Sequence, residues 1–105
     1  MNFEISLLIL AVLSFVQNMA FTAVSRSRNS GDTKYHFKVA LASNGVWFAT
    51  QVFILKHVWD VLESGDWWKL IIVGFVYTIS TAAGSTYMMA KLLKSETGKR
   101  RVGAR

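Results

Sequence analysis

Three long uncharged runs dominate the chain, and short polar stretches that hold the charged residues separate them. The runs cover residues 5–24, 39–55 and 70–90, which are 20, 17 and 21 residues long. An α-helix rises about 1.5 Å per residue, so about 20 apolar residues cross a hydrocarbon layer of about 30 Å. The first and third runs therefore predict transmembrane helices.

The second run is short for a span, but Val58, Val61 and Leu62 extend it by one or two helical turns. We therefore predict an all-α integral membrane protein with three transmembrane helices, at about residues 5–24, 39–62 and 68–93. They form one membrane domain, residues 1–95, and a basic tail follows at residues 96–105. The alternative is a chain with two spans, in which residues 39–62 lie at the membrane interface.

Lysine and arginine lie mostly on one side of the predicted spans. The opposite side has only Lys56 and Lys69, which lie close to acidic residues. Short segments rich in Lys and Arg stay in the cytoplasm, so we expect residues 25–38 and the tail to be cytoplasmic and the N-terminus to be outside. The basic residues that predict this topology, and that we expect to contact lipid headgroups, are Arg26, Arg28, Lys34, Lys38, Lys91, Lys94, Lys99, Arg100, Arg101 and Arg105.

The start of the chain differs from a cleavable signal peptide. A signal peptide begins with basic residues and has a short apolar core, whereas here Glu4 precedes a longer run and the basic residues follow it. We therefore expect a permanent span with its N-terminus outside. Cleavage near Ala23, where small residues lie, is the alternative.

The two polar connections have distinct chemistry. Residues 29–32, Asn-Ser-Gly-Asp, are typical of a turn between two helices. Around the second connection, Trp59, Trp67 and Trp68 predict anchors in the headgroup region, which amphipathic rings prefer.

Small and hydrogen-bonding residues recur at helical spacing inside each span. Residues three or four apart share a helix face, so these side chains predict one polar face on each helix. We interpret the faces either as helix-packing surfaces or as surfaces that line water when several copies associate. The residues are Ser14, Asn18 and Thr22 in the first span, Asn44 and Gln51 in the second, and Gly74, Thr78, Thr81, Gly84 and Ser85 in the third.

Several kinds of functional group are absent from the sequence, and their absence reduces the number of functions that fit it. No ionisable side chain lies in the middle of a span, which weakens an ion-coupled transporter as an interpretation. The chain has no cysteine, and His36 and His57 have no second ligand at metal-binding spacing. No catalytic constellation or phosphate-binding motif is present, so we expect no enzyme, cofactor or metal site. The net charge of +6 comes from residues that flank apolar runs, so we expect no nucleic-acid partner.

In layout, the whole chain resembles the class I holins of double-stranded DNA phages. The resemblance lies in its length, the three spans, the N-terminus outside and the basic tail, and it is closest over residues 74–101, GFVYTISTAAGSTYMMAKLLKSETGKRR. It departs from that family at residues 25–38, which are longer and more polar than a tight connection requires. The resemblance implies a protein of the bacterial inner membrane that forms homo-oligomers and opens lesions for an endolysin.

Two other functions fit the same layout. The chain could be a small membrane interaction protein, such as a phage exclusion or immunity factor or an accessory subunit, with the basic loop binding a regulatory membrane protein. In that case Ser25, Ser27, Asn29 and His36 would contact the partner. The chain could also be a small oligomeric transporter or channel, which the lack of an intramembrane charge weakens.

Overall fold

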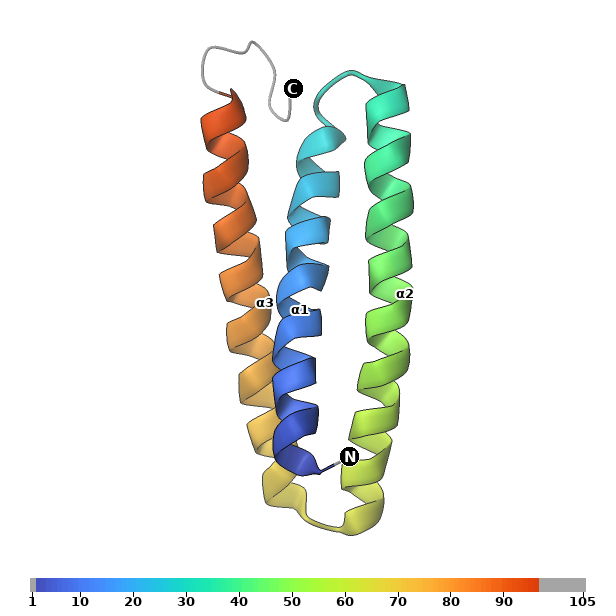
Figure 1. The fold of residues 1–105 in the computed structure, drawn as a ribbon, viewed down its shortest axis with the longest axis vertical. Coiled ribbons are helices and arrows are strands. Elements are labelled where there is room, and N and C mark those ends of the chain that lie inside the picture. The colour runs from blue at the N-terminus through green and yellow to red at the C-terminus, as the bar shows by residue number, and fades with distance from the viewer. Residues whose placement is uncertain (1, 97–105) are drawn as a thin grey trace.

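The computed structural model describes residues 2–96 and consists of three long helices that run up, down and up. They are α1 (Phe3–Ser27), α2 (Thr33–Ser64) and α3 (Trp67–Glu96). Figure 1 shows α1 between the other two. It packs closely against α3 and α2, whereas α2 and α3 contact each other little. α1 is therefore the central helix of an elongated molecule that measures 52 × 22 × 17 Å.

Local sequence signals explain where the helices begin and end. The side chain of Asn2 accepts a hydrogen bond of 2.8 Å from the Ile5 N–H, and Asp32 accepts one of 3.0 Å from the Tyr35 N–H. Both are N-caps, which satisfy backbone donors that the first turn leaves free. At the other end of α2, Gly65 has φ of 76°, a left-handed conformation that glycine adopts without a steric penalty.

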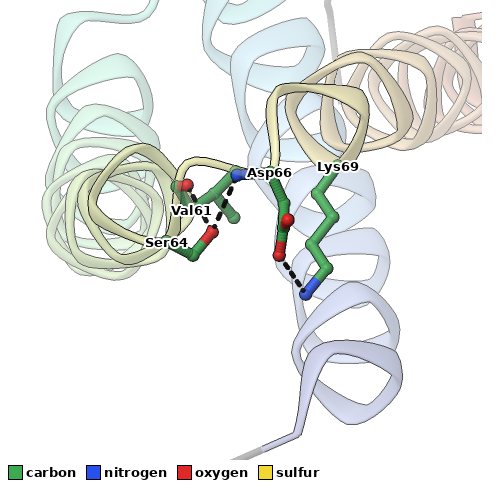
Figure 2. Close-up of polar contacts among 4 residues, drawn as sticks. All are labelled: Val61, Ser64, Asp66 and Lys69. Atoms are coloured by element: carbon green, nitrogen blue, oxygen red, sulfur yellow. Dashed lines mark hydrogen bonds and ion pairs between the residues drawn. The ribbon is translucent and has the colours of Figure 1, made fainter.

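The hydroxyl group of Ser64 stabilises the turn between α2 and α3. The Ser64 hydroxyl donates to the Val61 carbonyl at 2.7 Å and accepts from the Asp66 N–H at 3.3 Å (Figure 2). The Lys69 ammonium lies 3.3 Å from the Asp66 carboxylate in the first turn of α3. These contacts let α3 start two residues after Gly65.

All three helices are long and apolar enough to cross a membrane. With 25, 32 and 30 residues they measure about 37, 48 and 45 Å, more than the hydrocarbon thickness of about 30 Å. The prediction of an all-helical chain with three apolar helices is confirmed, and each predicted span lies inside one helix. α2 runs antiparallel beside α1, so laying residues 39–62 flat on a membrane would require that hairpin to open.

The expected loop at residues 25–38 is much shorter in the structure. α1 continues to Ser27 and α2 begins at Thr33, which leaves residues 28–32 outside the helices. The expectation placed the ends of the helices where the apolar runs end. In the structure both helices continue into polar residues, and the N-cap Asp32 sets the start of α2. At the other end of the chain α3 reaches Glu96, one residue into the expected tail, and residues 97–105 lie outside the described residues.

The surface of the three helices is apolar. Leu10, Val61 and Val73 form a small buried core. By contrast, the large side chains of Leu8 and Phe48 are 66% and 67% exposed, and many others of this kind are exposed along all three helices. Hydrocarbon solvates such a surface and water does not, so the distribution suits a membrane protein.

Candidate functional site

The polar side chains of the spans form an inward set and an outward set. The inward set begins with Gln17 of α1, which is 3% exposed. Its amide donates to the Tyr77 hydroxyl of α3 at 3.4 Å, and its carbonyl oxygen accepts from the Gln51 amide of α2 at 3.3 Å. This chain of hydrogen bonds joins all three helices near their middle. Of its members, the sequence prediction included Gln51 and missed Gln17 and Tyr77.

A second inward contact joins α1 and α3 nearer the end of α1. The hydroxyl groups of Thr22 and Ser85 share a hydrogen bond of 2.9 Å. Gly84, the residue before Ser85, lies directly against the backbone of Phe15, and a Cβ added to Gly84 would collide with the Phe15 carbonyl oxygen. Gly84 thus lies where α1 and α3 approach closely.

Two fully buried hydroxyl groups complete the inward set. Ser14 is 0% exposed, and its hydroxyl has no hydrogen-bond partner among residues 2–96. Thr50 is also 0% exposed, and it donates to the Val46 carbonyl of its own helix at 2.8 Å. Thr50 was not among the predicted residues.

The outward set lies on α2 and α3. Asn44, Gly74 and Thr78 are exposed on the surface of the chain. The Thr78 hydroxyl donates to the Gly74 carbonyl at 2.8 Å, and the half-buried Thr81 donates to the Tyr77 carbonyl at 2.9 Å. The two threonines therefore satisfy their hydroxyl donors within α3, whereas the Asn44 amide faces outward among large apolar side chains.

Part of the predicted faces on α2 and α3 lies beside the buried faces. On α2 the buried residues include Ser43 and Thr50, and the predicted Asn44 and Gln51 each follow by one residue. One residue is about 100° of helix rotation, so Asn44 is exposed, whereas the longer side chain of Gln51 still reaches Gln17. On α3 the same shift separates Gly74 and Thr78 from the inward Val73 and Tyr77, whereas the predicted Gly84 and Ser85 both contact α1.

A cavity of about 300 Å³ lies between α1 and α3, and four polar residues of the predicted faces or next to them line it. It is lined by Asn18, Thr22, Ser25 and Ser85, together with Arg26 and Met89. The Arg26 guanidinium donates to the Met89 sulfur at 3.1 Å. Asn18 therefore borders this cavity and lies half-buried, outside the Gln17 network.

The topology prediction rests on basic residues, and those within residues 2–96 lie at one end of the molecule. Figure 1 places the α1–α2 connection and the end of α3 together. The side chains there that are exposed are Arg28, Lys34, Lys38, Lys91 and Lys94, whereas Arg26 is half-buried. The predicted residues Lys99, Arg100 and Arg101 lie outside the described residues.

Polar residues of the first connection bond within the chain. Ser27 and His36 share a hydrogen bond of 2.8 Å between the serine hydroxyl and Nδ1 of the imidazole. The Asn29 amide donates to the Ser25 carbonyl at 3.3 Å, and the Ser30 hydroxyl donates to the Ser27 carbonyl at 2.7 Å. The connection is thus a folded turn.

The three predicted anchors lie at the opposite end. Trp59, Trp67 and Trp68 are 61%, 66% and 57% exposed, around the α2–α3 turn. Within residues 2–96, no group of three or more His, Asp or Glu side chains is arranged to hold a metal ion.

Comparison of the chain with protein families, with curated proteins and with solved structures found no match.

Proposed function

We propose that the chain is a small multi-pass protein of a bacterial inner membrane that self-associates and permeabilises the membrane in the manner of a holin. Its N-terminus is outside and its basic end is cytoplasmic. The observation that carries the proposal is the outward position of Asn44 within residues 39–55 of α2, whose other exposed residues are apolar.

An amide group in hydrocarbon without a hydrogen-bond partner costs several kcal/mol, on the order of 4–8 on alkane-transfer scales. A second copy or a column of water supplies the partner that lipid cannot. Asn44 lies one residue before Gly45, where a Cβ would meet nothing within 4 Å, so another helix can approach closely there. These features favour association through the outer face of α2.

The inward set has a different role. Gln17, Gln51 and Tyr77 bond to one another across the three helices, so they hold the monomer together. Thr22 and Ser85 do the same between α1 and α3. We therefore assign packing to these residues and assign the surface of the assembly, including any water-lining part, to Asn44, Gly74 and Thr78.

The interaction-protein alternative loses much of its support. It rested on the polar residues around the first connection, and Ser27, Asn29 and His36 make their hydrogen bonds inside the chain. The exposed cations that remain at this end act first as a topology signal and as a contact to anionic lipid.

The test is timed expression of the full chain in bacteria with a dye that reports the membrane potential. We expect an abrupt depolarisation after a lag, and cross-linking should recover oligomers. Asn44→Leu should delay or abolish both, because it removes the unpartnered amide, whereas Asn44→Gln should retain them.

Ala42→Leu is the matched control, since it adds bulk at another exposed position of α2 without removing a polar group. All variants are compared at equal amounts in the membrane fraction. Prolonged expression of the unaltered chain without depolarisation would refute permeabilisation. Equal behaviour of Asn44→Leu and the unaltered chain would refute the role of Asn44.

A further inference from the structure

A cavity of about 460 Å³ lies at the end of the molecule opposite the basic connection, and we name it the tryptophan-end cavity. Its wall combines the aromatic rings of Phe3 and Phe53 with the side chains of Lys56, His57, Asp60 and Lys69. These residues come from the start of α1, the last turns of α2 and the start of α3. The cavity therefore exists only where all three helices meet.

His57 is the buried polar group in this wall. It is 6% exposed, and its Nε2 has no hydrogen-bond partner among residues 2–96. Its ring lies between Phe3 and Phe53, with ring centroids 6.0 and 5.9 Å away. A buried imidazole nitrogen without a partner is costly, so a ligand that supplies one is favoured there.

Lys69 directs a positive charge to the same place. Its ammonium nitrogen lies 5.2 Å from the centre of the Phe3 ring and 5.7 Å from that of Trp68. It is also 3.3 Å from the Asp66 carboxylate, and Figure 2 shows the two side chains extending together from the α2–α3 turn. An ammonium group has three donors, so this arrangement holds Lys69 in place and leaves donors for an anion.

Carboxylates hold both ammonium groups of the cavity wall. Lys56 is paired with Asp60 at 2.8 Å, and Lys69 is paired with Asp66 at 3.3 Å. Each ammonium group has further N–H donors, which suit a phosphate because its oxygens accept several charge-assisted hydrogen bonds. The phenyl rings suit an adjoining apolar segment.

The position along the molecule identifies the kind of anion. Trp59, Trp67 and Trp68 surround this end with exposed rings, as residues at the headgroup level of a bilayer do. Lys69 is the third residue of α3, about 3 Å from its start, and a centred α3 exceeds a hydrocarbon layer of about 30 Å by about 7 Å at each end. Lys69 thus lies at the depth of lipid phosphate groups, and the phenyl rings of the cavity extend toward the hydrocarbon.

We propose that the tryptophan-end cavity binds the phosphate of a membrane phospholipid. Lys69 donates hydrogen bonds to the phosphate oxygens, His57 gains its missing partner from the same group, and the lipid chains follow the Phe3 and Phe53 rings into the hydrocarbon. The proposal depends on insertion into a membrane, and it does not depend on self-association or permeabilisation.

The test uses the full chain purified in detergent and native mass spectrometry with defined probes. The probes are dioleoylphosphatidylglycerol, dioleoylglycerol, which lacks the phosphate, and inorganic phosphate. We expect one phosphatidylglycerol to be retained at least about ten-fold more strongly than dioleoylglycerol, since a hydrogen bond to a charged group contributes about that factor or more. Inorganic phosphate should not displace the lipid.

Lys69→Gln and His57→Phe should each weaken retention of the phospholipid, Lys69→Gln by about ten-fold. Lys34→Gln, an exposed lysine at the opposite end that contacts headgroups without a cavity, is the matched control and should weaken retention much less than Lys69→Gln does. Circular dichroism confirms that each variant keeps its helices. If Lys69→Gln does not fold, His57→Phe alone tests the site.

Three results would overturn the proposal. Equal retention of dioleoylglycerol would mean that the lipid chains alone bind. An equal loss in Lys34→Gln would mean that any lysine contributes, and displacement by inorganic phosphate would mean a site for a free anion. Extraction of the chain from membranes by alkaline carbonate would refute membrane insertion and with it the proposed function as well, whereas any of the three results in a chain that resists extraction refutes the lipid site alone.

Discussion

Gly84 shows most directly how a single residue sets the distance between two helices. The position where its Cβ would stand is occupied by the backbone of Phe15, with the Phe15 carbonyl carbon at 2.9 Å and Cα at 3.0 Å. A backbone cannot move aside as a flexible side chain can. The close approach of α1 and α3 therefore requires glycine here, and the Thr22–Ser85 hydrogen bond lies one residue away on the same interface.

We expect Gly84→Ala to destabilise the folded protein by about 1–3 kcal/mol, because the added methyl group forces α1 and α3 apart. Gly74→Ala is the matched control in the same helix, since a Cβ there meets nothing within 4 Å. It should change the stability by less than about 1 kcal/mol, in the stabilising direction, because alanine favours helix. Unfolding in mixed detergent micelles, followed by circular dichroism, measures both. Equal effects of the two substitutions would contradict the close-packing role of Gly84.

At the level of single residues, the sequence predicted that each helix carries polar side chains. It did not predict which of these side chains face the neighbouring helices. The predicted Asn44 and Gln51 each lie one residue beyond the buried Ser43 and Thr50. Buried Ser43 and Thr50 and exposed Asn44 are all small polar residues of α2, so spacing alone does not tell which face is packed. The position of α1 decides it, and that position is a tertiary property. For the same reason the Gln17–Tyr77 contact, which joins residues 60 positions apart, was not predicted.

The helices themselves follow from local sequence much more closely. Long uncharged runs predicted three helices, and each predicted span lies inside one of them. The ends were harder to predict, because polar residues continue a helix as readily as they end it. Residues 25–27 and 33–38 are polar yet helical, and the Asp32 cap rather than a change in hydrophobicity marks where α2 begins.

The end of α2 depends on backbone conformation at one glycine. Gly65 has φ of 76° and an added Cβ would meet nothing within 4 Å, so a substitution there acts through the backbone alone. We expect Gly65→Ala to destabilise the α2–α3 hairpin by about 1 kcal/mol. Gly65→Asn should cost less, because asparagine adopts left-handed conformations more readily. The same unfolding measurement compares them, and a Gly65→Ala protein as stable as the unaltered chain would contradict the expectation.

The whole molecule is polarised along its length. Most of the exposed lysines and arginines among the described residues lie at the end with the α1–α2 connection, and the exposed Trp59, Trp67 and Trp68 lie at the end with the α2–α3 turn. Because α1 packs against both other helices while α2 and α3 hardly touch, the outer faces of α2 and α3 are open to lipid or to further copies. The proposed association surface and the tryptophan-end cavity therefore occupy different parts of one molecule.

The proposed orientation has a direct test, because the chain has no cysteine and a single introduced one can be labelled without background. Glu63→Cys lies at the tryptophan end and Asn29→Cys lies at the basic end, both at exposed positions. We expect a membrane-impermeant maleimide to label Glu63→Cys in intact cells whose outer membrane has been permeabilised, and Asn29→Cys only after lysis. The reverse pattern would refute the positive-inside assignment.

The pairing of the first helix with the last has a consequence during synthesis. Thr22 bonds to Ser85, 63 positions later, and Gln17 to Tyr77, 60 positions later. At about 5–20 residues per second, a ribosome needs about 3–12 s to make the intervening chain. A newly made α1 thus presents an unpaired amide and an unpaired hydroxyl for seconds before its own α3 exists. In that interval the α3 of a finished neighbour competes for the same groups, so rapid production of the protein favours exchange of α3 between chains.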